Sequence, residues 1–78
     1  MKLTLDRLSP EDRGKISAVN GQGALRRRLL DLGLTPGTGI FVRKVAPLGD
    51  PIEINIRGYE LTIRKSEAQL VEVDYDRT

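Results

Sequence analysis

The 78-residue sequence contains no cysteine and no histidine. Without cysteine, the chain can form no disulfide bond and offers no thiolate to a metal ion. Without histidine, it lacks the commonest general base and the commonest imidazole ligand of transition metals. No pairing of a nucleophile with a base is visible among the remaining polar residues. We therefore expect a protein that is not an enzyme and that holds no cofactor and no dedicated metal site.

Long apolar segments are absent too, and aromatic residues are few. No segment is apolar enough to span a bilayer, and the first residues lack the apolar region of a signal peptide. The only aromatic side chains are Phe41, Tyr59 and Tyr75, fewer than RNA-binding proteins usually offer for stacking. The 13 basic and 11 acidic residues give a mild net charge of +2. We expect a cytoplasmic protein that is not inserted in a membrane and binds no nucleic acid.

The apolar residues follow a period of two along most of the chain. Ile52, Ile54 and Ile56 alternate with polar residues, as do Leu61 and Ile63 after the tight hairpin signal at residues 57–58. Glycines and prolines separate short segments of this kind, which is typical of a small barrel. The sequence predicts a single domain over residues 1–78, mainly β, with one short α-helix and one helical turn near residues 65–69. The predicted inward-facing residues are Ile16, Leu25, Leu29, Leu32, Ile40, Val42, Ile52, Ile54, Ile56, Leu61, Ile63, Val71 and Val73.

One helix is predicted over residues 24–32, where Leu25, Leu29 and Leu32 recur at helical spacing. Asn20 is the expected N-cap residue. Gly33 is well placed as a left-handed residue after the helix, with the next residue, a leucine, contacting Leu29 in a Schellman ending. Residues 35–38, Thr-Pro-Gly-Thr, predict a type II turn. We expect the strand before this helix, residues 15–19, to place positions 16 and 18 on one face and 17 and 19 on the other.

The most conspicuous polar feature is the run of three arginines, Arg26, Arg27 and Arg28, on the predicted helix. Charge runs usually form a solvated face. Two other interpretations are a docking surface for an acidic partner and a nucleic-acid-binding surface. Leu30 lies roughly 140° from Leu25 on the helical wheel, so we expect it off the main apolar stripe. A leucine beside three arginines has the composition of a contact surface, although packing against a neighbouring loop is the ordinary alternative. We predict that these four residues bind an acidic partner.

Two further sequence patterns are weaker indications of a binding site. Residues 21–23, Gly-Gln-Gly, precede the helix, but the third glycine of a dinucleotide fingerprint is replaced by Arg26, so a plain turn is expected. The carboxylates Glu11 and Asp12, and the pair Asp74 and Asp76, lack the spacing of a calcium loop. We interpret them as solvated charges and leave weak surface binding of a divalent ion, and weak self-association of the chain, as open alternatives.

Three segments together resemble the FeoA family. Residues 27–38, RRLLDLGLTPGT, are similar to the family's helix and turn, with its basic pair, Leu-x-x-Leu-Gly and Pro-Gly-Thr or Pro-Gly-Ser. Residues 46–52, APLGDPI, resemble its Ala-Pro-Leu-Gly-Asp-Pro turn, and residues 58–68, GYELTIRKSEA, its closing segment, with Ile63 in place of a leucine. The resemblance covers roughly residues 3–73 with the segments in order. It implies an SH3-like β-barrel.

The resemblance also implies a role. FeoA-like proteins are cytoplasmic accessories of FeoB, the GTP-hydrolysing ferrous-iron transporter of the inner membrane, and are thought to contact its cytosolic region. We expect an adaptor that binds this region and modulates the transporter's activity or assembly.

The alternative is a regulatory module. Similar SH3-like domains form the C-terminal part of iron-dependent transcriptional repressors, behind a helix-turn-helix domain. This chain begins at Met1 without one. A helix-turn-helix extension upstream in the natural reading frame would favour this alternative.

Overall fold

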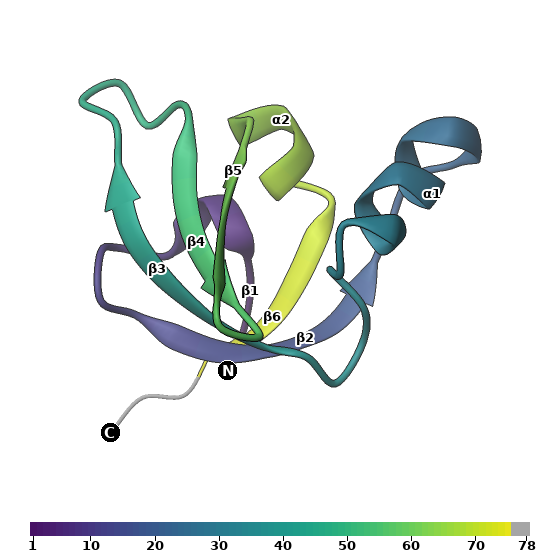
Figure 1. Cartoon of the computed structure of the whole chain (residues 1–78), viewed down its shortest axis with the longest axis horizontal. Helices are drawn as coiled ribbons and strands as arrows, with labels where there is room; N and C mark the ends of the chain where they lie inside the picture. Colours follow the sequence, from purple (N-terminus) through teal and green to yellow (C-terminus); the bar gives the residue numbers. More distant parts are fainter. Residues whose placement is uncertain (76–78) are drawn as a thin grey trace.

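Six strands form one antiparallel sheet in the order β1-β6-β2-β3-β4-β5. The structure is a computed structural model that describes residues 1–75. The sheet curls strongly, with the short helix α2 above it and the longer helix α1 to one side (Figure 1). The elements are, in chain order, β1 (Lys2–Thr4), the 3₁₀ turn η1 (Leu5–Arg7), β2 (Arg13–Val19), α1 (Gly23–Asp31), β3 (Gly39–Val45), β4 (Ile52–Ile56), β5 (Tyr59–Ile63), α2 (Lys65–Ala68) and β6 (Val71–Tyr75). No helix among these residues is long and apolar enough to cross a membrane.

The alternating isoleucines place the core as expected. Ile52, Ile54 and Ile56 of β4 are all buried, with the residues between them only half-buried. The hairpin to β5 turns at Arg57 and Gly58, which both have positive φ, 49° and 85°. This is the geometry of a type I′ turn, whose twist matches that of the strands it joins. The mainly β, SH3-like fold predicted from the sequence is confirmed.

Two bulges alter the faces of the strands. The register of β2 against β6 shifts between Ile16 and Ala18, and that of β3 against β4 shifts between Val42 and Lys44. A bulge adds a residue to one strand, so the alternation moves by one position and the strand bends. Val19 is therefore buried, whereas Ala18 is not. The expectation that Val19 would lie on the opposite face to Ile16 was wrong.

The end of α1 agrees with the expected Schellman motif. Gly33 has φ of 104°, and its N–H donates to the carbonyl of Leu30 at 3.0 Å. The N–H of Leu34 donates to the carbonyl of Leu29 at 3.2 Å. Both Leu29 and Leu34 are completely buried, so the chain after the helix is fixed against the barrel. A β-carbon on Gly33 would lie only 2.8 Å from the hydroxyl oxygen of Tyr59.

The core differs from the predicted one mainly at α1. Leu25 is 42% exposed instead of buried, and Leu32 and Leu61 are half-buried. Asn20 does not cap the helix; Gln22 holds the N-cap position, and the Asn20 side chain donates to Glu72 at 2.7 Å. The remaining predicted inward-facing residues are buried, and the sequence pattern missed five that join them: Leu5, Leu8, Val19, Leu34 and Ala68.

Candidate partner-binding surface

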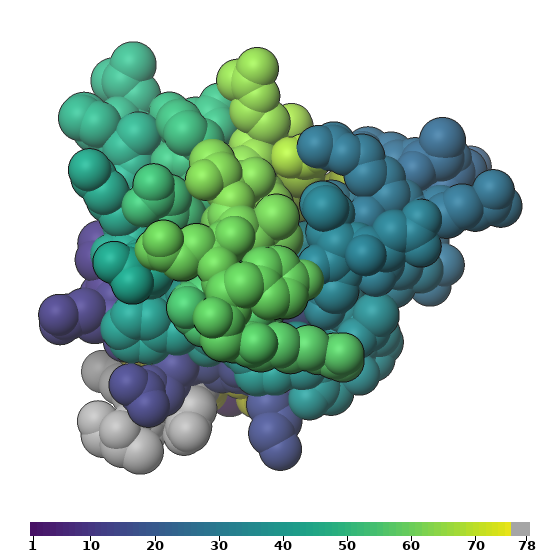
Figure 2. Space-filling view, viewed as in Figure 1, coloured from purple at the N-terminus to yellow at the C-terminus, as the bar shows by residue number. Residues whose placement is uncertain are grey.

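Helix α1 projects from the barrel. In Figure 2 it forms the lobe at the right edge of the molecule, beyond the strands. The only buried residue of the helix is Leu29, and only the end of the helix, where Leu29 lies, is anchored in the core. Leu25 lies one helical turn earlier and is 42% exposed. The predicted stripe of leucines is therefore buried at one end only.

The three arginines of α1 do different things. Arg26 turns back to the sheet, and its Nε donates to the backbone carbonyl of Val19 at 3.0 Å. Arg28 reaches the second helix, where it forms an ion pair with the buried carboxylate of Glu67. Both side chains therefore tie α1 to the barrel. Arg27 is exposed and forms no such contact within residues 1–75.

The carboxylate of Glu67 that pairs with Arg28 is itself held in place by a second hydrogen bond. The other carboxylate oxygen of Glu67 accepts a hydrogen bond from the backbone N–H of Arg64 at 2.8 Å, at the start of α2 (Lys65–Ala68). Glu67 thus caps its own helix and holds α1 at the same time. A buried carboxylate needs partners of this kind, because burial removes its water. The sequence offered no signal for this pair, whose members lie 39 positions apart.

Leu30 is not the exposed apolar residue that the helical wheel predicted. It is half-buried and packs against the core, which is the ordinary alternative considered for it. The exposed leucine of this helix is Leu25. The structure thus brings Arg26, Arg28 and Leu30 into internal contacts. Leu25, which sequence reasoning had placed in the core, is exposed, and Arg27 is exposed with no internal contact of its side chain among residues 1–75.

The acidic side chains do not gather. Asp12 accepts hydrogen bonds from the Ser9 amide at 2.8 Å and the Tyr75 hydroxyl at 3.0 Å, and Asp74 pairs with the N-terminal amine at 3.3 Å. Asp76 lies outside the described residues. Within residues 1–75, no three carboxylates are close enough to hold a metal ion together.

The fold places this chain among small SH3-like domains. Residues 3–75 match the FeoA domain family, so the chain belongs to that family. Its members are non-enzymatic accessory domains, and this chain is one as well, as expected.

The similar proteins support this membership. A relative from Porphyromonas gingivalis, an "Fe(2+) transport protein A/Fe(2+) transporter FeoB fusion protein", is 35% identical over 72 residues. The match covers 92% of this chain and only 8% of that relative. A crystal structure of an iron uptake regulatory protein, FeoA, is 33% identical with a TM-score of 0.90, covering 97% of this chain and 100% of that one.

Two further structures mark the range of the fold. FeoA of Stenotrophomonas maltophilia in complex with zinc, described as an SH3-domain protein, is 28% identical with a TM-score of 0.80, covering 92% of this chain and 89% of that one. IdeR of T. acidophilum has a TM-score of 0.85 over 96% of this chain and 34% of its own, at 22% identity. The likeness to IdeR shows the fold alone.

Proposed function

We propose that this chain is a cytoplasmic, single-domain accessory protein of ferrous-iron uptake, which binds the cytosolic part of a FeoB-like transporter and modulates its activity or assembly. The observation that carries the proposal is the relative in which the matching segment is joined to FeoB in one polypeptide. Fusion holds two partners at high effective concentration, which is useful when the separate chains must meet.

The proposed contact surface is that of α1, predicted as Arg26, Arg27, Arg28 and Leu30. The contacts of the helix change which of its residues we expect to touch the partner. Arg26 and Arg28 are exposed to solvent but orient the helix through their contacts with the barrel. Arg27 is exposed and forms no such contact within residues 1–75, and Leu25 beside it is exposed as well. An exposed leucine beside an arginine that has no ion pair among residues 1–75 offers an apolar contact with a charged rim, the usual composition of an interface. The complementary surface on the transporter would be acidic.

Isothermal titration against the purified cytosolic domain of FeoB from the same organism tests the proposal. We expect saturable binding by the wild-type protein. Arg27→Glu should weaken it by about tenfold, because like charges would then meet at the interface. Arg7→Glu is the matched control, since it makes the same charge change at an exposed position of η1 and should leave the affinity unchanged. Loss of affinity in neither variant would remove α1 from the interface, and no binding by the wild-type protein would refute the adaptor.

The alternative function is a regulatory module related to the C-terminal domain of iron-dependent repressors. The observation in its favour is the likeness in fold to IdeR. A helix-turn-helix segment encoded in frame ahead of this chain, together with operator DNA binding by the longer protein, would establish it. Binding to the transporter domain without such a segment would refute it.

A further inference from the structure

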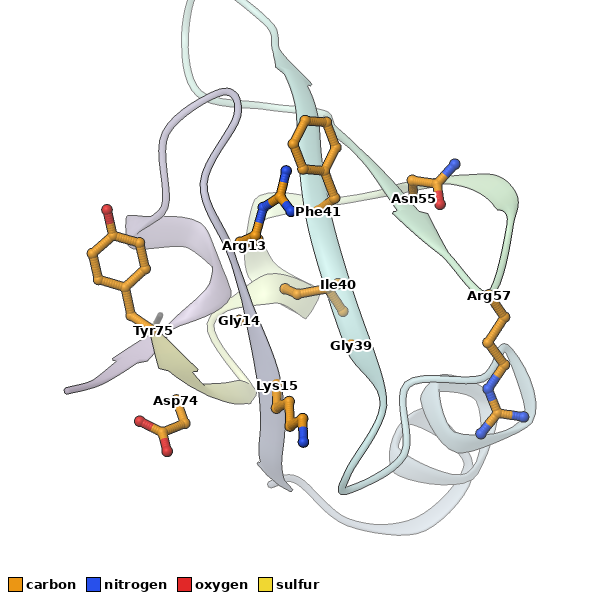
Figure 3. Close-up of a pocket in the computed structure, with 10 residues that line it drawn as sticks. All are labelled: Arg13, Gly14, Lys15, Gly39, Ile40, Phe41, Asn55, Arg57, Asp74 and Tyr75. Atoms are coloured by element: carbon orange, nitrogen blue, oxygen red, sulfur yellow. The ribbon is translucent and has the colours of Figure 1, made fainter. Parts of the chain in front are cut away.

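The outer face of the sheet carries an open hollow of about 610 Å³, separate from α1. Figure 3 shows it over β2 and β3, with side chains from β4 and β6 at its margins. The residues on this face alternate with those of the core, so they are not needed to fill the barrel. Nothing in the proposed function uses them.

The strand register sets these residues in two rows. Arg13 of β2 is opposite Phe41 of β3, which is in turn opposite Asn55 of β4. In the next row, Lys15 of β2 is opposite Gly39 of β3. Glycine has no side chain to fill the space, and the position where its β-carbon would stand has no atom nearer than 4.0 Å. A shallow channel therefore lies beside the ring of Phe41, bordered along β2 by the cationic side chains of Arg13 and Lys15.

The hollow is positively charged. Arg13, Lys15 and Arg57 line it, and none of the three forms an ion pair with a carboxylate within residues 1–75. The guanidinium of Arg13 lies 5.3 Å from the centre of the Phe41 ring, and that of Arg57 donates to the hydroxyl of Thr38 at 3.2 Å.

One acidic side chain also lines the hollow. Asp74 lies directly opposite Lys15 on the neighbouring strand and pairs with the N-terminal amine at 3.3 Å, so part of its charge is offset locally. The three cations Arg13, Lys15 and Arg57 outnumber this one carboxylate. The ligand that complements such a surface is anionic.

We propose that this channel binds an extended acidic segment of a partner protein. Arg13 and Lys15 lie two residues apart on one face of a strand, hence about 7 Å apart along it. Carboxylates at alternate positions of an extended peptide repeat at the same spacing, so each can meet one cation. Two aromatic rings line the hollow, and both are engaged: Arg13 covers the ring of Phe41, and Tyr75 packs against the core with its hydroxyl donating to Asp12. Neither ring is an open platform on which a base could stack. The inference goes beyond the proposed function and does not depend on the partner being the transporter.

Fluorescence anisotropy with a short labelled peptide in which glutamate alternates with valine tests this proposal. We expect saturable binding at low salt that weakens as salt is raised, and none with a peptide in which glutamine replaces glutamate. Lys15→Glu should weaken binding by about tenfold or more, because it sets like charges together. Lys65→Glu, an exposed lysine of α2 outside the hollow, is the matched control and should bind as the wild type does.

Two further measurements keep the outcome decisive. A peptide of alternating lysine and valine should bind the Lys15→Glu variant better than it binds the wild type. Amide shifts of the wild-type protein on adding the acidic peptide should fall on residues 13–15, 39–41 and 55–57, which needs no variant to fold. Absence of binding, equal weakening by Lys15→Glu and Lys65→Glu, or shifts confined to α1 would overturn the proposal. So would tighter binding of a single-stranded oligonucleotide of equal charge, which would make the channel a nucleic-acid site.

Discussion

The barrel and helix α1 are stabilised by different means. In the barrel, fully buried aliphatic side chains from β2, β3, β4 and β6 interlock around one core. In α1, a single leucine is buried, and two arginines hold the helix by polar contacts with β2 and α2. Burial of aliphatic side chains contributes more free energy than partly exposed ion pairs do. Because few residues of α1 are needed for packing, its exposed residues can contact a partner at little cost to stability.

The largest difference between the two regions should appear on truncating one leucine-sized side chain in each. Ile54→Ala removes a completely buried group from β4 and should lower the free energy of unfolding by about 2–5 kcal/mol. Leu25→Ala, on the exposed side of α1, should change it by less than about 0.5 kcal/mol. Urea denaturation followed by circular dichroism measures both. A loss well below about 1 kcal/mol at Ile54 would mean that this side chain is not part of the packed core.

Two glycines that pair with neighbours in the sheet offer the next contrast. A β-carbon on Gly14 would lie 2.5 Å from the carbonyl oxygen of Asp74, so Gly14→Ala must push β2 and β6 apart. We expect a loss of about 1–3 kcal/mol, the usual range for overpacking. Gly39→Ala, on the neighbouring strand, meets no atom nearer than 4.0 Å and should leave stability unchanged or slightly higher. Thermal melting of both variants tests this, and equal losses would contradict the close approach of β2 and β6.

The smallest effects distinguish the arginines of α1 from one another. Arg28→Ala leaves the buried carboxylate of Glu67 without its ionic partner, and we expect a loss of about 1–2 kcal/mol. Arg27→Ala removes no internal contact of the described chain and should alter stability by less than about 0.5 kcal/mol. Chemical denaturation of the two variants side by side decides between them. The same loss for both would mean that the charge of the helix, rather than the pair with Glu67, matters.

The strands of the barrel were predictable from the sequence where apolar and polar residues alternate strictly. The alternating isoleucines of β4, the hairpin at Arg57 and the end of α1 at Gly33 each follow from local rules of pattern and turn geometry. Val19 was placed on the wrong face because a bulge, which depends on pairing with β6, changes the alternation. The local pattern carries no sign of that bulge.

The candidate surface was predictable only as a segment. The arginine run is visible in the sequence, but which arginines form contacts with the barrel depends on a carbonyl of β2 and a carboxylate of α2. The periodicity of Leu25 and Leu29 is that of a helix lying flat on a core, whereas α1 buries a leucine in the core only near its end, at Leu29. The outer channel was missed, although Arg13 and Lys15 alternate with the buried Gly14 and Ile16 and could have marked a charged strand face.

The most direct test of the accessory role is an NMR titration of the labelled protein with the cytosolic domain of the FeoB-like transporter. We predict saturable shifts and line broadening concentrated on the amides of residues 23–31, with the largest changes around Leu25 and Arg27. Shifts concentrated instead on residues 13–15 and 39–41 would assign the transporter to the outer channel and remove α1 from the interface. An unchanged spectrum at saturating concentrations would contradict the proposal that this domain binds the cytosolic part of the transporter.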